Sequence, residues 1–497
     1  MPGENKHADT KGVDAVDSIK VRMYNTGSVG DCFLVLFQKK EVTTFTMMID
    51  CGGIKAPADK ITTCMESIAK ACGGHIDLLL ITHQHEDHLS GFNLARSVFD
   101  KITVGETWMS WVENADDDLG QLVKKKYGKK LKELQTALAA NLATGQTGKK
   151  GPVAATDRAA GARRQFIRDN LTESLELLAF EAGGEPKKGL KGPRTNEDAM
   201  QYLKGKNIVY RKPGEIVSMP KAEGVRFYVL GPPRDADLKF LKIETNPDQM
   251  YHLALAAAPG DAPAAGPLLS DVESLLVDNR SPFAPEFALQ GADLTAWEKF
   301  YQSDQMRWRQ IEDDWKESGS DMALALTRLT NNTSLAIALE FVSSGVVLLL
   351  PADAQSGNWM SWHKPEVVGA FQKQGGKDIN ELLTNTVFYK VGHHSSHNGT
   401  ASLSGLELMT NSKLVAFIPL VQDKVPSAWG GPRNFPAAKL YQKIIEKAKG
   451  RVVRTDEGLV TDARAVALRN GLSAADEADF KKNYKPGDCY FEYTVNA

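Results

Sequence analysis

The chain has 497 residues, of which 42% are hydrophobic and 25% charged, and its formal net charge at pH 7 is −2. This composition is typical of a folded globular protein, and the small net charge excludes a global electrostatic attraction to nucleic acid or anionic membranes. No apolar run approaches the ~20 residues that cross a bilayer, and the first twenty residues lack the apolar stretch of a signal peptide. The five cysteines show no zinc-like pairing, so we expect a cytoplasmic protein with reduced thiols.

Strands and helices alternate in the first part of the chain. Residues 1–18 are polar and predict a disordered lead-in. The β-rich and helix-spaced runs that follow predict strands over 19–24, 32–37, 44–50, 76–81 and 102–108, with helices over 59–71 and 90–99.

The loop after the strand over 76–81 holds three of the ten histidines, in the order His83-Gln84-His85-Glu86-Asp87-His88. Imidazole nitrogens and carboxylate oxygens are preferred ligands of zinc, manganese and iron. The spacing can serve two metals, with His83 and His85 reaching one ion and Asp87 and His88 the other. Two ions roughly 3.5–4 Å apart form a hydrolytic centre that activates water between them.

This loop matches the HxHxDH signature of the metallo-β-lactamase superfamily, and the chain resembles that superfamily over about 20–110 and 325–465. The strands that end at Asp50 and Asp353 resemble two further strands of its fold. The run that reaches His393 and His394 resembles the strand and loop bearing its last histidine ligand. Because this pair is followed by serine, the chain is similar to the soluble hydrolase domain of the DNA-uptake protein ComEC and to its free-standing bacterial relatives.

The resemblance implies an α/β (α+β) fold, a four-layer αββα metallo-β-lactamase sandwich with large inserted segments. It also implies a site with two divalent metal ions, Zn²⁺ by preference or Mn²⁺. The implied metal ligands are His83, His85, Asp87, His88, Asp353 and His393.

Two of these positions are expected to take part in catalysis. Asp87 would orient the attacking hydroxide, and His394 would contact the substrate or act as general acid. His393 is preferred to His394 as the ligand because neighbours on an extended segment point to opposite sides. Asp50 is expected to accept a hydrogen bond from a ligand imidazole, and Asp31 either does the same or serves a turn.

The chain departs from the superfamily at two places near these ligands. Ala352 stands before Asp353, where the family usually has glycine. Many members also supply a further histidine between the loop and the bridging aspartate, whereas this chain has only His252 there, inside an ordinary helical pattern. The resemblance therefore leaves the first metal position short of a ligand.

The remaining segments divide the chain around the two halves of the expected fold. Residues 19–111 form its first half, 112–214 a basic helical insertion, 215–231 a return to the sheet, 232–325 a second insertion, and 326–497 the second half with a C-terminal tail. Residues 120–214 hold about twenty Lys or Arg against about nine Asp or Glu. Such a segment can bind nucleic-acid phosphates, bind a protein partner, or simply form solvated helix faces.

Three functions remain open at this point. A metal-dependent hydrolase acting on a phosphodiester, as a nuclease or nucleotide phosphodiesterase, is the first. A hydrolase of small esters, lactones or thioesters is the second, and it predicts a narrow apolar pocket. A metal-stabilised effector or scaffold subunit is the third, because one fold serves many functions.

Overall fold

The computed structural model describes residues 15–125, 195–235, 238–243, 245–251 and 329–497. All of them belong to one compact unit, and the second unit, residues 130–177 and 253–326, falls outside them. The structure is a mixed α/β arrangement of two eight-stranded sheets with helices.

The first sheet runs through both ends of the described chain. It is antiparallel from β15 to β3 and parallel from β3 to β6. Its strands, in spatial order, are β15 (Tyr484–Pro486), β16 (Tyr490–Asn496), β1 (Ser18–Tyr24), β2 (Cys32–Lys39), β3 (Val42–Cys51), β4 (His75–Leu80), β5 (Thr103–Ser110) and β6 (Ile208–Arg211).

The second sheet follows the same plan. It is antiparallel from β7 to β10, parallel from β10 to β13, and antiparallel again at β14. Its strands, in spatial order, are β14 (Gly458–Leu459), β13 (Val452–Arg454), β12 (Val415–Ile418), β11 (Thr386–Lys390), β10 (Val347–Leu350), β9 (Ile337–Phe341), β8 (Val225–Val229) and β7 (Ile216–Ser218).

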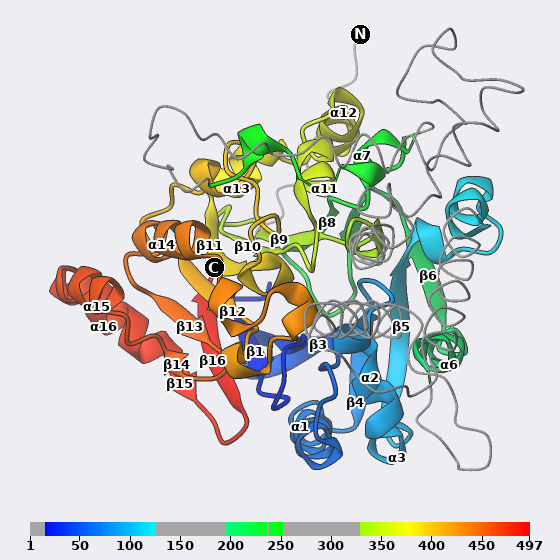
Figure 1. Ribbon diagram of the computed structural model, residues 1–497, viewed down its shortest axis with the longest axis horizontal. Helices are drawn as coiled ribbons and strands as arrows, with labels where there is room; N and C mark the ends of the chain where they lie inside the picture. Colours follow the sequence, from blue (N-terminus) through cyan, green and yellow to red (C-terminus); the bar gives the residue numbers. More distant parts are fainter. Residues whose placement is uncertain (1–14, 126–194, 236–237, 244, 252–328) are drawn as a thin grey trace, which may run out of the picture. The chain divides into compact units, whose positions relative to one another are not determined.

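Helices follow or separate these strands (Figure 1). The α-helices are α1 (Ala58–Ala71), α2 (Glu86–Leu94), α3 (Arg96–Phe99), α6 (Asn196–Leu203), α7 (Lys239–Lys242), α11 (Ser356–Ser361), α12 (Pro365–Lys373), α13 (Ile379–Thr384), α14 (Ala438–Lys447), α15 (Ala463–Asn470) and α16 (Ala474–Asn483). The 3₁₀ turns are η1 (Trp111–Glu113), η2 (Pro247–Gln249), η6 (Gly392–Ser395), η7 (Leu406–Leu408), η8 (Gln422–Lys424), η9 (Ser427–Trp429) and η10 (Pro432–Asn434).

The main core lies between the two sheets. Alternate residues of each strand enter it, for example Phe33 and Val35 from β2 and Leu339 from β9. The intervening residues of the same strands, such as Leu34 and Ala338, enter separate clusters with the helices. Strands buried on both faces read as continuous apolar runs, which is why the sequence of these strands shows little polar alternation.

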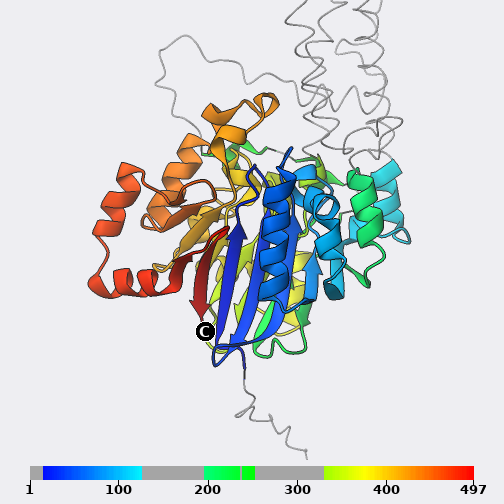
Figure 2. The ribbon, with the colours of Figure 1, turned by 90° about the horizontal axis from the view of Figure 1, so that it is seen from below.

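The helices pack against the faces of the sheets that point away from this core. Apolar residues of α1, α2, α3 and α6 join the cluster on the first sheet, and those of α11 to α14 join the cluster on the second. Figure 2 shows α1 lying over the blue strands of the first sheet. Each sheet is therefore packed on one face against the other sheet and on the opposite face against helices.

Most strands predicted from the sequence are confirmed. Two boundaries differ. Residues 196–211, placed in the basic insertion by the sequence, contribute α6 and β6, and β6 extends the first sheet beside β5. The C-terminal tail is also part of this sheet, because β16 pairs with β1 along its whole length.

Candidate metal centre

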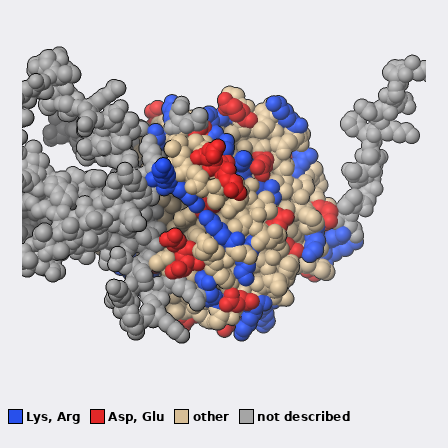
Figure 3. All heavy atoms as spheres, turned by 90° about the vertical axis from the view of Figure 1, so that its right-hand side faces the viewer, with Lys and Arg blue, Asp and Glu red and all other residues tan. Residues whose placement is uncertain are grey.

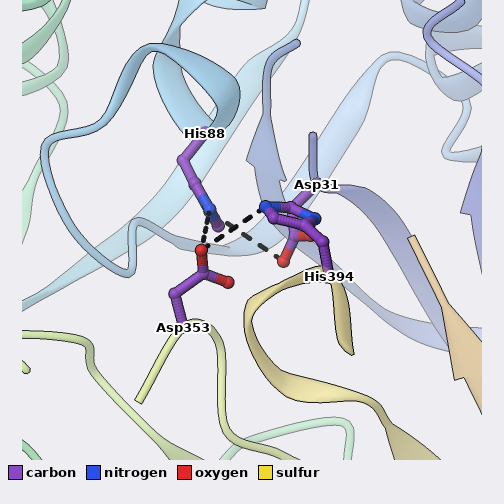
Figure 4. A group of neighbouring side chains, drawn as sticks. All are labelled: Asp31, His88, Asp353 and His394. Atoms are coloured by element: carbon purple, nitrogen blue, oxygen red, sulfur yellow. Dashed lines mark ion pairs between the residues drawn. The ribbon is translucent and has the colours of Figure 1, made fainter. Parts of the chain in front are cut away.

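Four side chains from both halves of the described chain meet near the ends of the central strands (Figure 4). They are Asp31, between β1 and β2; His88, in α2; Asp353, after β10; and His394, in η6. One ligand atom from each lies within 4.8 Å of those of the others, and all four side chains are buried. A buried group of two imidazoles and two carboxylates could hold a metal ion.

Asp87 borders the same space. Its Oδ2 lies 2.8 Å from His394 Nε2, and its Oδ1 lies 3.7 Å from His88 Nε2. Asp87 Oδ1 and His88 Nε2 are both buried and have no hydrogen-bond partner among the described residues. Buried polar atoms are rarely left unsatisfied, so these two atoms fit a cation placed between them.

Helix α2 brings Asp87 and His88 to this position. The sequence predicts a helix from residue 90, but α2 begins at Glu86, with His85 extended at its N-cap. That start is favourable because Glu86 and Asp87 place negative charge in the first turn, near the positive end of the helix dipole. Asp87 and His88 therefore sit on a helix rather than in a loop.

Asp50, the last residue but one of β3, fixes the orientation of His88. His88 Nδ1 donates to Asp50 Oδ2 at 2.7 Å, while Thr82 donates to the same carboxylate through its backbone and its hydroxyl. This contact turns Nε2 toward the cluster, where it faces Asp353 Oδ2 at 3.2 Å. The hydrogen bond that Asp50 was expected to accept from a candidate ligand imidazole is thus present.

The two neighbouring histidines of η6 do not have the orientations expected for an extended segment. The segment is not extended: His393, His394 and Ser395 have φ values of 47°, 50° and 64°, a left-handed turn. His394 donates from Nδ1 to Pro419 O at 2.8 Å and presents Nε2 to the cluster. His393 instead contacts Ser396 Oγ at 2.7 Å and Asn331 Nδ2 at 3.2 Å.

His394, and not His393, therefore belongs to the buried group of possible ligands. The alternation rule for extended chains does not apply to a left-handed turn, so it gives no ground for preferring His393 to His394 as the ligand.

His83 and His85 lie beside this group rather than in it. Both are buried, and His83 Nε2 lies 2.9 Å from His85 Nδ1. The ring of His83 is 4.2 Å from that of His88, centre to centre. The pair expected at the first metal position is thus adjacent to the cluster, with its nitrogens turned toward each other.

The carboxylates of the cluster raise the pKa values of its two histidines, His88 and His394. Burial alone would lower the pKa of His394, but Asp353 and Asp87 raise it to about 10. Burial opposes protonation of His88 too, yet Asp353, Asp87, Asp31 and Asp50 raise its pKa well above the usual value. In the ion-free protein, protons on these two imidazoles balance carboxylates that a cation would otherwise balance.

Lys390 is a member of the site that the sequence reasoning missed. It ends β11, is 3% exposed, and its Nζ lies 2.5 Å from Asp31 Oδ2 and 3.3 Å from Asp353 Oδ1. The signal was present in the sequence, because a lone lysine in an apolar strand is rarely buried without a partner.

Some expectations lie outside the described residues. His252 is among them, as are residues 126–194 of the basic segment and most of the second insertion. Of the helices that the structure describes, none has the length and apolarity needed to cross a membrane.

No family model matches the chain, and no curated protein matches it either.

Proposed function

We propose that this chain is a metal-dependent hydrolase of the metallo-β-lactamase superfamily, and that its two sheets and flanking helices form the four-layer αββα sandwich of that superfamily. One observation carries the proposal. Asp87 and His88, which follow β4 of the first sheet, meet Asp353 and His394, which follow β10 and β11 of the second. Oxygen and imidazole donors from two distant parts of the chain converge on one buried point.

One divalent ion would be held by Asp87, His88, Asp353 and His394, and a second by His83 and His85, with Zn²⁺ or Mn²⁺ suited to this mixed set of donors. A bound ion of this kind supplies a nucleophile at neutral pH and stabilises the negative charge that develops during hydrolysis.

The residues of the chain orient the two imidazoles for this chemistry. The bonds from Nδ1 to Asp50 and to Pro419 O turn Nε2 of His88 and of His394 toward the cluster, where a bound ion would displace the proton that each Nε2 otherwise carries. Since His394 is turned toward the candidate ligands, this proposal places it among the groups that hold the ion. His393 is partly exposed and bonded to Ser396, and burial lowers its pKa to about 3, so it is an uncharged imidazole and not a proton donor at neutral pH.

The substrate class that we propose is a phosphodiester, as for a nuclease or a nucleotide phosphodiesterase. Its support lies in the sequence: the His-His-Ser motif at 393–395 and the excess of cations in residues 120–214. The face drawn in Figure 3 adds no support to it, because acidic and basic side chains are interspersed there.

Hydrolysis of a small ester, lactone or thioester is the second candidate, and one observation favours it. The ring of Trp429 lies parallel to that of His394, within 17°, at 6.3 Å between centres, and Phe435 packs 6.1 Å from Trp429. An aromatic wall beside the ligands suits an apolar substrate.

The experiment is cleavage of single- and double-stranded DNA and RNA with added Zn²⁺ or Mn²⁺. Asp87→Asn should reduce the rate more than about 100-fold, since even outer partners of metal ligands are worth about 10–100-fold. Asp77→Asn is the matched control, because Asp77 lies in β4 of the same sheet but pairs with Lys221, outside the cluster. Absence of cleavage by ion-loaded protein would reject the phosphodiester, and esters and lactones would be tested next.

A further inference from the structure

Lys390 brings a permanent positive charge into the cluster. Its Nζ contacts three oxygens: Ala352 O at 2.9 Å, Asp353 Oδ1 at 3.3 Å and Asp31 Oδ2 at 2.5 Å. Lysine is seldom buried to this degree unless its charge is paired. The ammonium therefore occupies the space between the two carboxylates.

The two oxygens of Asp353 have different surroundings. Oδ1 is held by Lys390, whereas Oδ2 faces His88 Nε2 at 3.2 Å and His394 Nε2 at 3.4 Å. An oxygen that already accepts a charge-assisted hydrogen bond is a poor ligand for a second cation. Asp353 thus offers one oxygen to an ion.

Asp31 approaches the histidines from their other side. Its oxygens lie 3.9 Å from His88 Nδ1 and 3.8 Å from His394 Nδ1, the nitrogens that are bonded to Asp50 and to Pro419. Asp87 and Asp353, in contrast, approach the Nε2 atoms of both rings. By distance alone, Asp31 would count among the ligands. Its oxygens, however, approach the Nδ1 side of both rings and not the Nε2 side, which faces Asp87 and Asp353.

From these contacts we propose that Lys390 neutralises Asp31, keeps it from coordinating the ion, and restricts Asp353 to coordination through Oδ2. Lys390 is a positioning residue in this proposal, which rests on the proposed metal centre. Its physical basis is that two buried carboxylates without a counter-ion attract whatever cation is available. Without Lys390, Asp31 would become an additional ligand.

Visible absorption during Co²⁺ titration tests this directly, because the intensity of the Co²⁺ bands falls as the coordination number rises. We expect Asp31→Asn to keep the wild-type spectrum, whereas Asp87→Asn changes it. Lys390→Met should show weaker bands and bind Co²⁺ about tenfold more tightly than the double variant Asp31→Asn/Lys390→Met, since only the single variant retains the unpaired carboxylate of Asp31.

Lys377→Met is the matched control. Lys377 pairs with the buried Glu340 at 3.2 Å in the second sheet, away from the cluster, so its removal should leave the Co²⁺ spectrum unchanged.

Two results would overturn the proposal: a changed spectrum in Asp31→Asn like that of Asp87→Asn, or identical spectra and affinities for Lys390→Met and the double variant. If Lys390→Met does not fold, the spectrum of Asp31→Asn decides alone. These readouts need no turnover, so a failure of the hydrolase proposal in the cleavage experiment remains a separate result.

Discussion

At the scale of single residues, the geometry of the site depends on which ring nitrogen of His88 and of His394 is turned away from the cluster by a hydrogen bond. His88 and His394 both have Nδ1 engaged by an acceptor, Asp50 in one case and Pro419 O in the other. Both present Nε2 to the same buried space. The donors were readable from the sequence, because their residue types and spacing are unusual. The partner of Nδ1 was readable only for His88, since the acceptor for His394 is a backbone carbonyl, which no residue type signals.

Asp50→Asn tests the value of this orientation. The amide can still contact His88, but it has no negative charge with which to accept the hydrogen bonds from His88 and Thr82. The imidazole is therefore held less firmly. We expect metal affinity to fall by about 10–100-fold, with little loss of folded protein. Titration with a competing chromophoric chelator measures the affinity. An unchanged affinity would mean that Asp50 serves the fold and not the metal centre.

At the scale of elements, the site depends on how closely the chain segments approach one another. A Cβ at Gly52 would overlap the backbone of Asp87 and His88, so α2 can begin where it does only because Gly52 has no side chain. Ala352 has a φ of 54°, a left-handed conformation in which glycine is favoured. Glycine at residue 352 would adopt this conformation without the strain that alanine bears.

The handedness of turns is a feature that the sequence did not predict. The strands could be predicted because both of their faces are apolar. The left-handed turn at His393 to Ser395 could not, because none of these three residue types requires a positive φ. One unpredicted turn was enough to bring His394, rather than His393, into the buried group of possible ligands.

Gly52→Ala should therefore damage the site through the backbone. We expect a loss of about 1–3 kcal/mol in the free energy of unfolding, typical of overpacking, together with weaker metal binding as α2 is displaced. Gly369→Ala is the control, because a Cβ there meets no atom within 4 Å and the residue lies inside α12. Chemical denaturation with and without the ion measures both effects; equal stability of the two variants would contradict the account.

At the scale of the whole described unit, the site joins two eight-stranded sheets that each contain an antiparallel and a parallel part. An ion bound by ligands from both sheets links them in the folded state and has no equivalent site in the unfolded chain. Its binding must therefore raise the stability of the fold. The sequence did not predict the pairing of β6 with β5 or of β16 with β1, because long stretches of chain separate the strands of each pair.

Metal removal should lower the melting temperature, and by more at pH 8 than at pH 6. In the ion-free protein the pKa of His394 is raised to about 10, so its stabilising contribution is complete below the unfolded pKa of about 6.5 and is lost as pH rises toward 10. The ion must displace the same proton, which becomes easier as pH rises. Melting curves with and without chelator at both pH values measure this. A difference that is smaller at pH 8 would contradict it.

The most direct test of the metal centre is anomalous diffraction from crystals grown with Zn²⁺ or Mn²⁺. The account predicts a peak bounded by the Asp87 carboxylate, Nε2 of His88 and His394, and Oδ2 of Asp353. Crystals of ion-saturated protein with no anomalous peak among these four side chains would contradict it.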